Sequence, residues 1–356
     1  MLLWQNILTA SISGPGSRLY QILAENAHMP HNSGNSSAGR RSPALADWYR
    51  GSVTVVRRVL GEAVTPLTRL VELPGRGATR VWECPGPRRA ETVMLIHGVA
   101  VNAELNWGKV LAPLGRHFRV VAADLRSHGD GIREGSPFRL EDCADDVAAL
   151  AAVLGIRTFV AVGYSMGGMV AQLLARRHAS LLSGLVLCST AGNVRESPAE
   201  RLAALGLPTA AAALRWNPLL QLMSAELLGM TLLGHLDNPA TASWARAELG
   251  RTTLASAVSA IQAVCEFNSD EWISELDVPA AVVVTTRDRI VPASRQRRLA
   301  RAIPGATVHE VPGDHGVCIN APQLFAPALL EACWSVAPGR GGGGTLTAAD
   351  RSDQPA

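Results

Sequence analysis

A serine between two glycines is the residue of this chain best placed to act as a nucleophile. Ser165 lies in the motif Gly163-Tyr164-Ser165-Met166-Gly167, between the apolar run 159–162 and a helical pattern that starts at Met169. A strand, a sharp turn and a helix around G-x-S-x-G form a nucleophile elbow, which holds the serine hydroxyl clear of its neighbours. The turn needs glycine on both sides because a Cβ there would obstruct the close passage of the chain. We therefore expect Ser165 to attack an acyl carbon.

A serine nucleophile needs a general base, and the base needs a group that orients it. Asp288 follows the apolar run 280–284, and His315 lies in the loop after the run 308–311. His309 alternates within that second run, so we expect it to have a structural role. Ser165, Asp288 and His315 occur in the order nucleophile, acid, base, which differs from the order in the two main groups of serine proteases. We assign these three residues as a catalytic triad.

The oxyanion of the reaction also needs hydrogen-bond donors. The N–H of Met166 follows the nucleophile directly, and the N–H of Val99 lies in the loop after the apolar run 92–96, so we assign both to an oxyanion hole. We expect His97 to hold this loop rather than to react. The loop Asp124–Gly131 contains His128 and Asp130, for which we also expect a loop-shaping role because no nucleophile accompanies them.

The elements around these residues form a regular pattern. Almost wholly apolar runs at 92–96, 119–123, 159–162, 184–188 and 280–284 are typical of strands buried on both faces of a parallel sheet. Helical patterns lie between several of them, including one at 140–154 that begins with acidic residues, which suits the helix dipole. Two alternating runs at 68–73 and 79–84, with Pro74-Gly75 between them, predict a half-exposed edge hairpin. The whole predicts a doubly wound, mostly parallel α/β sheet with ligands at the carboxyl ends of its strands.

The chain divides into four predicted parts. Residues 1–45 are a flexible leader, 46–190 and 277–335 form the α/β core, 191–276 form a helical insertion over the strand ends, and 336–356 are a disordered tail. The insertion contains no clear strand, and its helical stretches lie at 201–205, 210–214, 219–233 and 243–264. An alternative is that the insertion only adds a second packing layer and has no part in binding.

Composition excludes several classes of function. Hydrophobic residues make up 47% of the chain, and a net charge of +3 without a basic, aromatic-rich cluster argues against nucleic acid as a partner. Six scattered cysteines without paired spacing predict no metal site, and we expect no cofactor. The N-terminus lacks the basic start of a signal peptide and no apolar run could span a bilayer, so we expect a cytoplasmic protein. Residues 1–12 could alternatively anchor it peripherally to a membrane. Lys109 is the only lysine.

From about Thr68 to Trp334 the chain resembles the α/β-hydrolase superfamily, and within it the capped serine esterase, lipase and perhydrolase-like group. The resemblance rests on His97-Gly98, the loop Asp124–Gly131, Gly163 to Gly168, Asp288 with Val291-Pro292, and His315. It implies that residues 191–276 are the cap. The segment after His97 lacks the His-Gly-Gly-Gly of one lipase and esterase group. Haloalkane dehalogenases and epoxide hydrolases have aspartate where this chain has Ser165, so their chemistry is disfavoured.

We expect a serine hydrolase that cleaves a small carboxylic ester through an acyl-enzyme. The Leu-, Ala- and Met-rich insertion suggests an apolar acyl or alcohol group. C–C bond hydrolysis, perhydrolysis and acyl transfer on the same triad are alternatives, and so is a binding relative that has lost catalysis. The sequence leaves the oligomeric state open.

Overall fold

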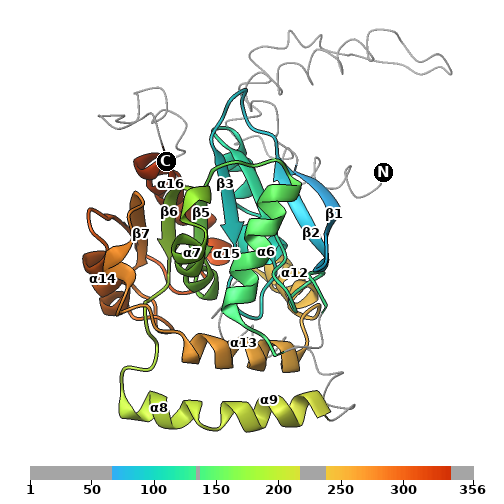
Figure 1. Ribbon diagram of the computed structural model, residues 1–356, viewed down its shortest axis with the longest axis vertical. Helices are drawn as coiled ribbons and strands as arrows, with labels where there is room; N and C mark the ends of the chain where they lie inside the picture. The colour runs from blue at the N-terminus through green and yellow to red at the C-terminus, as the bar shows by residue number, and fades with distance from the viewer. Residues whose placement is uncertain (1–65, 134–136, 217–237, 338–356) are drawn as a thin grey trace, which may run out of the picture. The chain divides into compact units, whose positions relative to one another are not determined.

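An eight-stranded, mostly parallel sheet carries the residues that the sequence selects (Figure 1). The computed structural model describes residues 66–133, 137–216 and 238–337, all within the unit Ala63–Ala356. The predicted leader, the helical stretch at 219–233 and the tail from residue 338 lie outside the described residues. Strand order is β1-β2-β4-β3-β5-β6-β7-β8, which confirms the predicted doubly wound α/β class.

The predicted hairpin is present, but only its first strand lies at the edge. β1 (Leu67–Leu73) and β2 (Gly77–Cys84) pair antiparallel across the turn at Pro74-Gly75. β2 also pairs antiparallel with β4 (Arg119–Ala123), so it lies inside the sheet. Its residues Val81 and Cys84 are therefore fully buried, whereas Leu67 and Leu70 of β1 are exposed.

The apolar runs form the parallel strands, as predicted. β3 (Thr92–Ile96), β5 (Phe159–Tyr164) and β7 (Ala280–Thr285) are buried at every position. β6 (Leu182–Cys188) is buried over its last five residues, and β8 (Thr307–Val311) closes the other edge with a more exposed pattern.

Two apolar cores, one on each face of the sheet, follow from the alternation of side chains along the strands. Met94 and Ile96 of β3 enter one core, and Val93 and Leu95 enter the other. The first core is covered by α6 (Leu140–Val153), α7 (Met166–Arg177) and α14 (Ala293–Ala302). The second is covered by α4 (Ala103–Trp107), α5 (Leu111–Gly115), α15 (Val317–Asn320) and α16 (Pro322–Val336). Two short 3-10 helices lie at Ala179–Leu181 and Ile273–Glu275.

Four described helices follow β6 in the predicted insertion: α8 (Pro198–Ala204), α9 (Leu207–Trp216), α12 (Pro239–Leu249) and α13 (Leu254–Glu266). The stretch 243–264, predicted as one helical segment, is two helices, because α12 ends at Leu249 with Gly250 as its C-cap, and the Thr253 side chain caps α13 by accepting a hydrogen bond from Ser256 N. α9 runs alongside α13 (Figure 1).

α12 is tied to the segment that follows β3. Ala245 and Leu249 of α12 enter the second core. Asn102 Nδ2 donates to Glu248 Oε2 at 2.6 Å, and the Nζ atom of Lys109 lies 5.3 Å from the ring centroid of Trp244. None of the helices in the described ranges is both long enough and apolar enough to cross a bilayer.

Candidate active site

Ser165 occupies a sharp turn between β5 and α7. Its backbone has φ +54° and ψ −119°, a left-handed conformation that is costly for a residue with a side chain. A Cβ at Gly163 would meet the Gly167 carbonyl, and one at Gly167 would meet the Ile96 carbonyl, so both positions exclude side chains. The turn is held on both sides: Ser165 N donates to Cys188 O at 2.9 Å, and Thr190 Oγ1 donates to Ser165 O at 2.8 Å.

The structure brings the three predicted triad residues together. His315 Nε2 lies 3.0 Å from Ser165 Oγ, and His315 Nδ1 lies 2.7 Å from Asp288 Oδ2. The carboxylate can only accept, so we assign the proton to Nδ1, which leaves the Nε2 lone pair facing the serine hydroxyl. Asp288 and His315 are 6% and 8% exposed, so little solvent competes for these contacts. The arrangement can remove a proton from Ser165 as its oxygen attacks.

The loop after β3 places Val99 beside the serine. Gly98 N donates to Asn106 Oδ1 at 2.9 Å, and Val99 and Ser165 line the same cavity of about 20 Å³. That volume holds about one water-sized group. The N–H of Met166 begins α7 directly after the nucleophile. The roles of the Val99 and Met166 N–H groups as oxyanion donors stay predictions.

His97 is buried, and none of its partners among the described residues is acidic. Its Nδ1 lies 2.8 Å from Gly98 O, and its Nε2 accepts from Leu125 N at 2.8 Å, so the ring joins the loop after β3 to the loop after β4. Burial, reinforced by the neighbouring His128, lowers the pKa of His97 to about 3. A neutral imidazole with both nitrogens in use has the loop-holding role that we expected.

The Asp124–Gly131 loop is held by its own polar groups. The buried Asp124 accepts from Ala103 N at 2.9 Å and from Asp130 N at 2.8 Å, and burial raises its pKa to about 6. Asp130 pairs with Arg80 at 2.6 Å and also with Arg251. These partners agree with the loop-shaping role expected of Asp130.

His128 has a similar setting. Its Nδ1 lies 3.0 Å from Arg126 O, and its ring lies 5.4 Å from that of His97 and 5.7 Å from that of Phe138. Burial lowers the pKa of His128 to about 4. Its Nε2 has no hydrogen-bond partner among the described residues. The ring therefore packs in this loop as a neutral group. His309, the other histidine expected to be structural, lies on β8 with Glu331 and Thr307 as its partners.

Sequence reasoning missed two polar side chains that hold the site. Tyr164 Oη donates to the backbone carbonyl of His315 at 2.8 Å, and the two rings meet edge to face at 5.8 Å. Asn106 anchors Gly98 and also donates to Cys318 Sγ at 3.5 Å. Tyr164 lies inside the elbow motif, which is a visible signal, but no feature of the sequence distinguishes Asn106.

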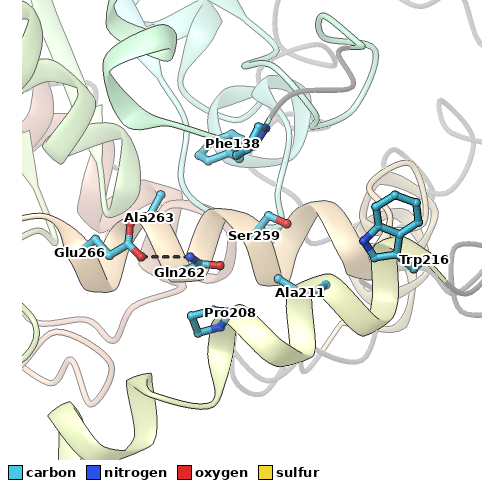
Figure 2. Close-up of a pocket in the computed structure, with 10 residues that line it drawn as sticks. Phe138, Pro208, Ala211, Trp216, Ser259, Gln262, Ala263 and Glu266 are labelled. Carbon is cyan, nitrogen blue, oxygen red and sulfur yellow. Dashed lines mark hydrogen bonds between the residues drawn. The ribbon is translucent and has the colours of Figure 1, made fainter.

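A second, larger cavity lies between α9 and α13. Figure 2 shows Phe138 on one side of α13, with Pro208 and Ala211 of α9 facing the helix from the other. The cavity measures about 310 Å³, within the usual range for small ligands. Its lining is mixed: Ser259, Gln262 and Glu266 contribute polar surface, and the apolar residues are Pro137, Phe138, Pro208, Ala211, Ala212, Trp216 and Ala263. Within the described ranges, no three His, Cys, Asp or Glu side chains gather as metal ligands would.

Known proteins match this chain over the region that contains Ser165, Asp288 and His315. The alpha/beta hydrolase fold family matches residues 91–322. RutD of Caulobacter sp. (strain K31), named as a carbamate hydrolase, is 30% identical over 256 residues, which cover 68% of this chain and 90% of that protein. A non-heme chloroperoxidase of Streptomyces lividans is 28% identical over 257 residues, or 69% of this chain and 92% of its own. A thermophilic esterase from Thermogutta terrifontis has a TM-score of 0.64 at 23% identity, over 76% of this chain and 99% of that structure.

Proposed function

Because the chain belongs to the alpha/beta hydrolase fold family, we propose that it is a serine hydrolase that cleaves carboxylic esters through an acyl-enzyme. One observation carries the proposal: a continuous hydrogen-bonded chain runs from Asp288 through His315 to Ser165, with distances of 2.7 and 3.0 Å. A serine hydrogen-bonded to an imidazole, which is in turn hydrogen-bonded to a carboxylate, performs acyl transfer on several unrelated folds.

In the proposed mechanism, His315 Nε2 takes the proton of Ser165 while Oγ attacks the carbonyl carbon of the ester. Asp288 holds the Nδ1–H and stabilises the imidazolium that forms. The N–H groups of Val99 and Met166 bind the tetrahedral oxyanion. His315 then protonates the leaving alcohol, and a water molecule activated by the same imidazole releases the acid.

The surroundings of Ser165 favour an ester with an apolar acyl or alcohol group. Val99, Val101 and Ile319 give the cavity at the serine a mostly apolar lining, and apolar residues also contribute to the larger cavity between α9 and α13. We assign residues 191–276, which include these two helices, as a cap over the site. The six thiols are all free, which suits a reducing compartment such as the cytoplasm.

Hydrolysis of p-nitrophenyl esters from acetate to palmitate, with Ser165→Ala alongside, tests the proposal. We expect release that depends on Ser165 and has an optimum in chain length. An aryl carbamate belongs in the panel because RutD is named for that substrate class. Labelling by a fluorophosphonate, which needs an activated serine but no particular substrate, separates a wrong substrate from a wrong mechanism. Absence of both release and labelling at Ser165 would refute the proposal.

A further inference from the structure

The hydrogen-bonded chain at the active site does not end at Asp288. Thr285, the last residue of β7, donates its hydroxyl to Asp288 Oδ2 at 2.8 Å. Gln296 of α14 donates from Nε2 to Thr285 Oγ1 at 2.8 Å and to Val291 O at 2.7 Å, while its Oε1 accepts from Thr285 N at 3.0 Å. We propose that Thr285 and Gln296 are positioning residues, which fix the carboxylate of Asp288 and through it the imidazole of His315. The inference rests on the proposed serine-hydrolase function.

The direction of the Thr285 hydroxyl follows from its partners. Its oxygen accepts from Gln296, so its own proton is left for either Asp288 Oδ2 at 2.8 Å or Ser189 Oγ at 3.1 Å. The shorter contact has the ionised acceptor, which makes the stronger hydrogen bond. Gln296 therefore aims the Thr285 hydroxyl at the carboxylate.

The carboxylate has a full set of donors. Oδ1 accepts from the N–H groups of Ile290 and Val291 at 2.8 and 2.9 Å, and Oδ2 accepts from Thr285 and from His315 Nδ1. Gln296 Nε2 adds a longer contact to Oδ2 at 3.3 Å. A carboxylate offers about four acceptor sites, so these donors occupy them and prevent rotation about the side chain. The oxygen that faces His315 is thereby held at one angle.

Gln296 is unusual for its place in the chain. It lies between two arginines on a strongly basic helix, yet it is completely buried, and so is Thr285. Neither side chain lines the cavity at Ser165, so neither is placed to contact substrate. A change at either residue should therefore alter kcat and leave KM unchanged.

A matched pair of substitutions at Thr285 tests the role of the hydroxyl. Thr285→Val keeps the shape and removes the donor, whereas Thr285→Ser keeps the donor. We expect Thr285→Val to lower kcat and the rate of fluorophosphonate labelling roughly 10- to 100-fold, the scale of a misplaced catalytic group, with KM within about twofold of wild type. Thr285→Ser should retain most of the rate. Gln296→Met should give an intermediate loss, and Arg297→Gln, at an exposed ion pair on the same helix, serves as the control.

Proton NMR supplies a measurement that would not change if Thr285 had a purely structural role. The downfield signal of the His315 Nδ1–H, identified by its loss in Asp288→Asn, should shift or broaden in Thr285→Val and return in Thr285→Ser. Melting temperatures show whether each variant folds, and if Gln296→Met does not, the Thr285 pair still decides the question. Wild-type rates and an unchanged NMR signal in Thr285→Val would overturn this inference alone. A wild-type protein that is not labelled at Ser165 would instead overturn the proposed function.

Discussion

Two parts of this molecule bury histidine in opposite ways. His315 faces a carboxylate at 2.7 Å on one nitrogen and a hydroxyl at 3.0 Å on the other. In the loops after β3 and β4, His97 and His128 contact backbone groups and each other's rings, and within the part of the chain that the structure describes neither ring meets a carboxylate. Burial there lowers their pKa values to about 3 and about 4, which makes them neutral supports. All three rings are buried, so burial does not separate a candidate base from a structural ring. The carboxylate at Nδ1 of His315, opposite the nitrogen that faces Ser165, is what separates them.

Removal of each imidazole is the strongest test of this contrast. His315→Ala should lower kcat on the order of a million-fold, and Ser165→Ala should do the same, because triad members act as one unit. His128→Asn keeps a donor for Arg126 O and should leave kcat within about tenfold of wild type. Steady-state rates on the best p-nitrophenyl ester give the comparison, and equal losses in the two histidine variants would contradict it.

Loss of the acidic partner should make His315 resemble His97. Asp288→Asn replaces the carboxylate with an amide, so it should favour the wrong tautomer and lower kcat on the order of ten-thousand-fold. Asp130→Asn removes a carboxylate that pairs with Arg80 at the surface of the loop and is the matched control. Our assignment of the acid would be wrong if Asp288→Asn kept the activity of the control.

The neutral histidines should make the protein less stable in acid. Between pH 6 and 5 the unfolded chain protonates His97 and His128 but the native protein does not, so these two groups lower the free energy of unfolding by about 2.7 kcal/mol per pH unit as pH falls. Asp124 acts in the opposite direction, because its native pKa of about 6 lies above its ordinary 3.8. As pH falls, its protonation in the native protein raises the free energy of unfolding by about 1.4 kcal/mol per unit. From these three groups we expect a net loss of about 1.4 kcal/mol per unit.

Urea unfolding at several pH values between 4 and 7 measures this slope. His128→Asn removes one of the two histidine contributions, so the slope of its free energy of unfolding between pH 6 and 5 should be smaller than that of the wild type by about 1.4 kcal/mol per unit. A slope equal to that of the wild type would show that His128 does not stay neutral in the native protein.

The smallest expected effect comes from Tyr164, which contacts the backbone of His315 rather than its ring nitrogens. Tyr164→Phe leaves the His315 carbonyl without its buried donor and should lower the free energy of unfolding by about 1–2 kcal/mol. We expect kcat to fall less than tenfold, because the contacts of Nδ1 and Nε2 persist. A loss as large as that of Asp288→Asn would mean that the carbonyl contact, and not the carboxylate, orients the ring.

Local pattern was sufficient for much of the fold and for the candidate residues. The apolar runs predict β3, β5 and β7 because strands buried on both faces need apolar residues at every position. The candidate residues could be predicted because Ser165, Asp288 and His315 each follow a strand, and the ends of parallel strands meet at one edge of the sheet. The glycines around Ser165 mark the sharp turn at the first of these strand ends.

Features that depend on distant partners could not be predicted. The inner place of β2 depends on its pairing with β4, about 40 residues away, which its own alternation does not encode. Gln296 has the neighbours of a surface residue, since arginines flank it on both sides. Only the fold shows that its face of α14 turns toward Thr285 and Asp288.

The contact between Lys109 and Trp244 has a practical consequence for protein chemistry. Because Lys109 is the only lysine of the chain, an amine-reactive reagent finds one side-chain target. That target is exposed and lies at the face where α12 meets the segment after β3. A fluorophore attached there would report separation of α12 from this segment through quenching by the indole, without any engineered cysteine. The same single lysine side chain offers a point for attachment to a solid support, away from Ser165 in sequence and outside its cavity lining.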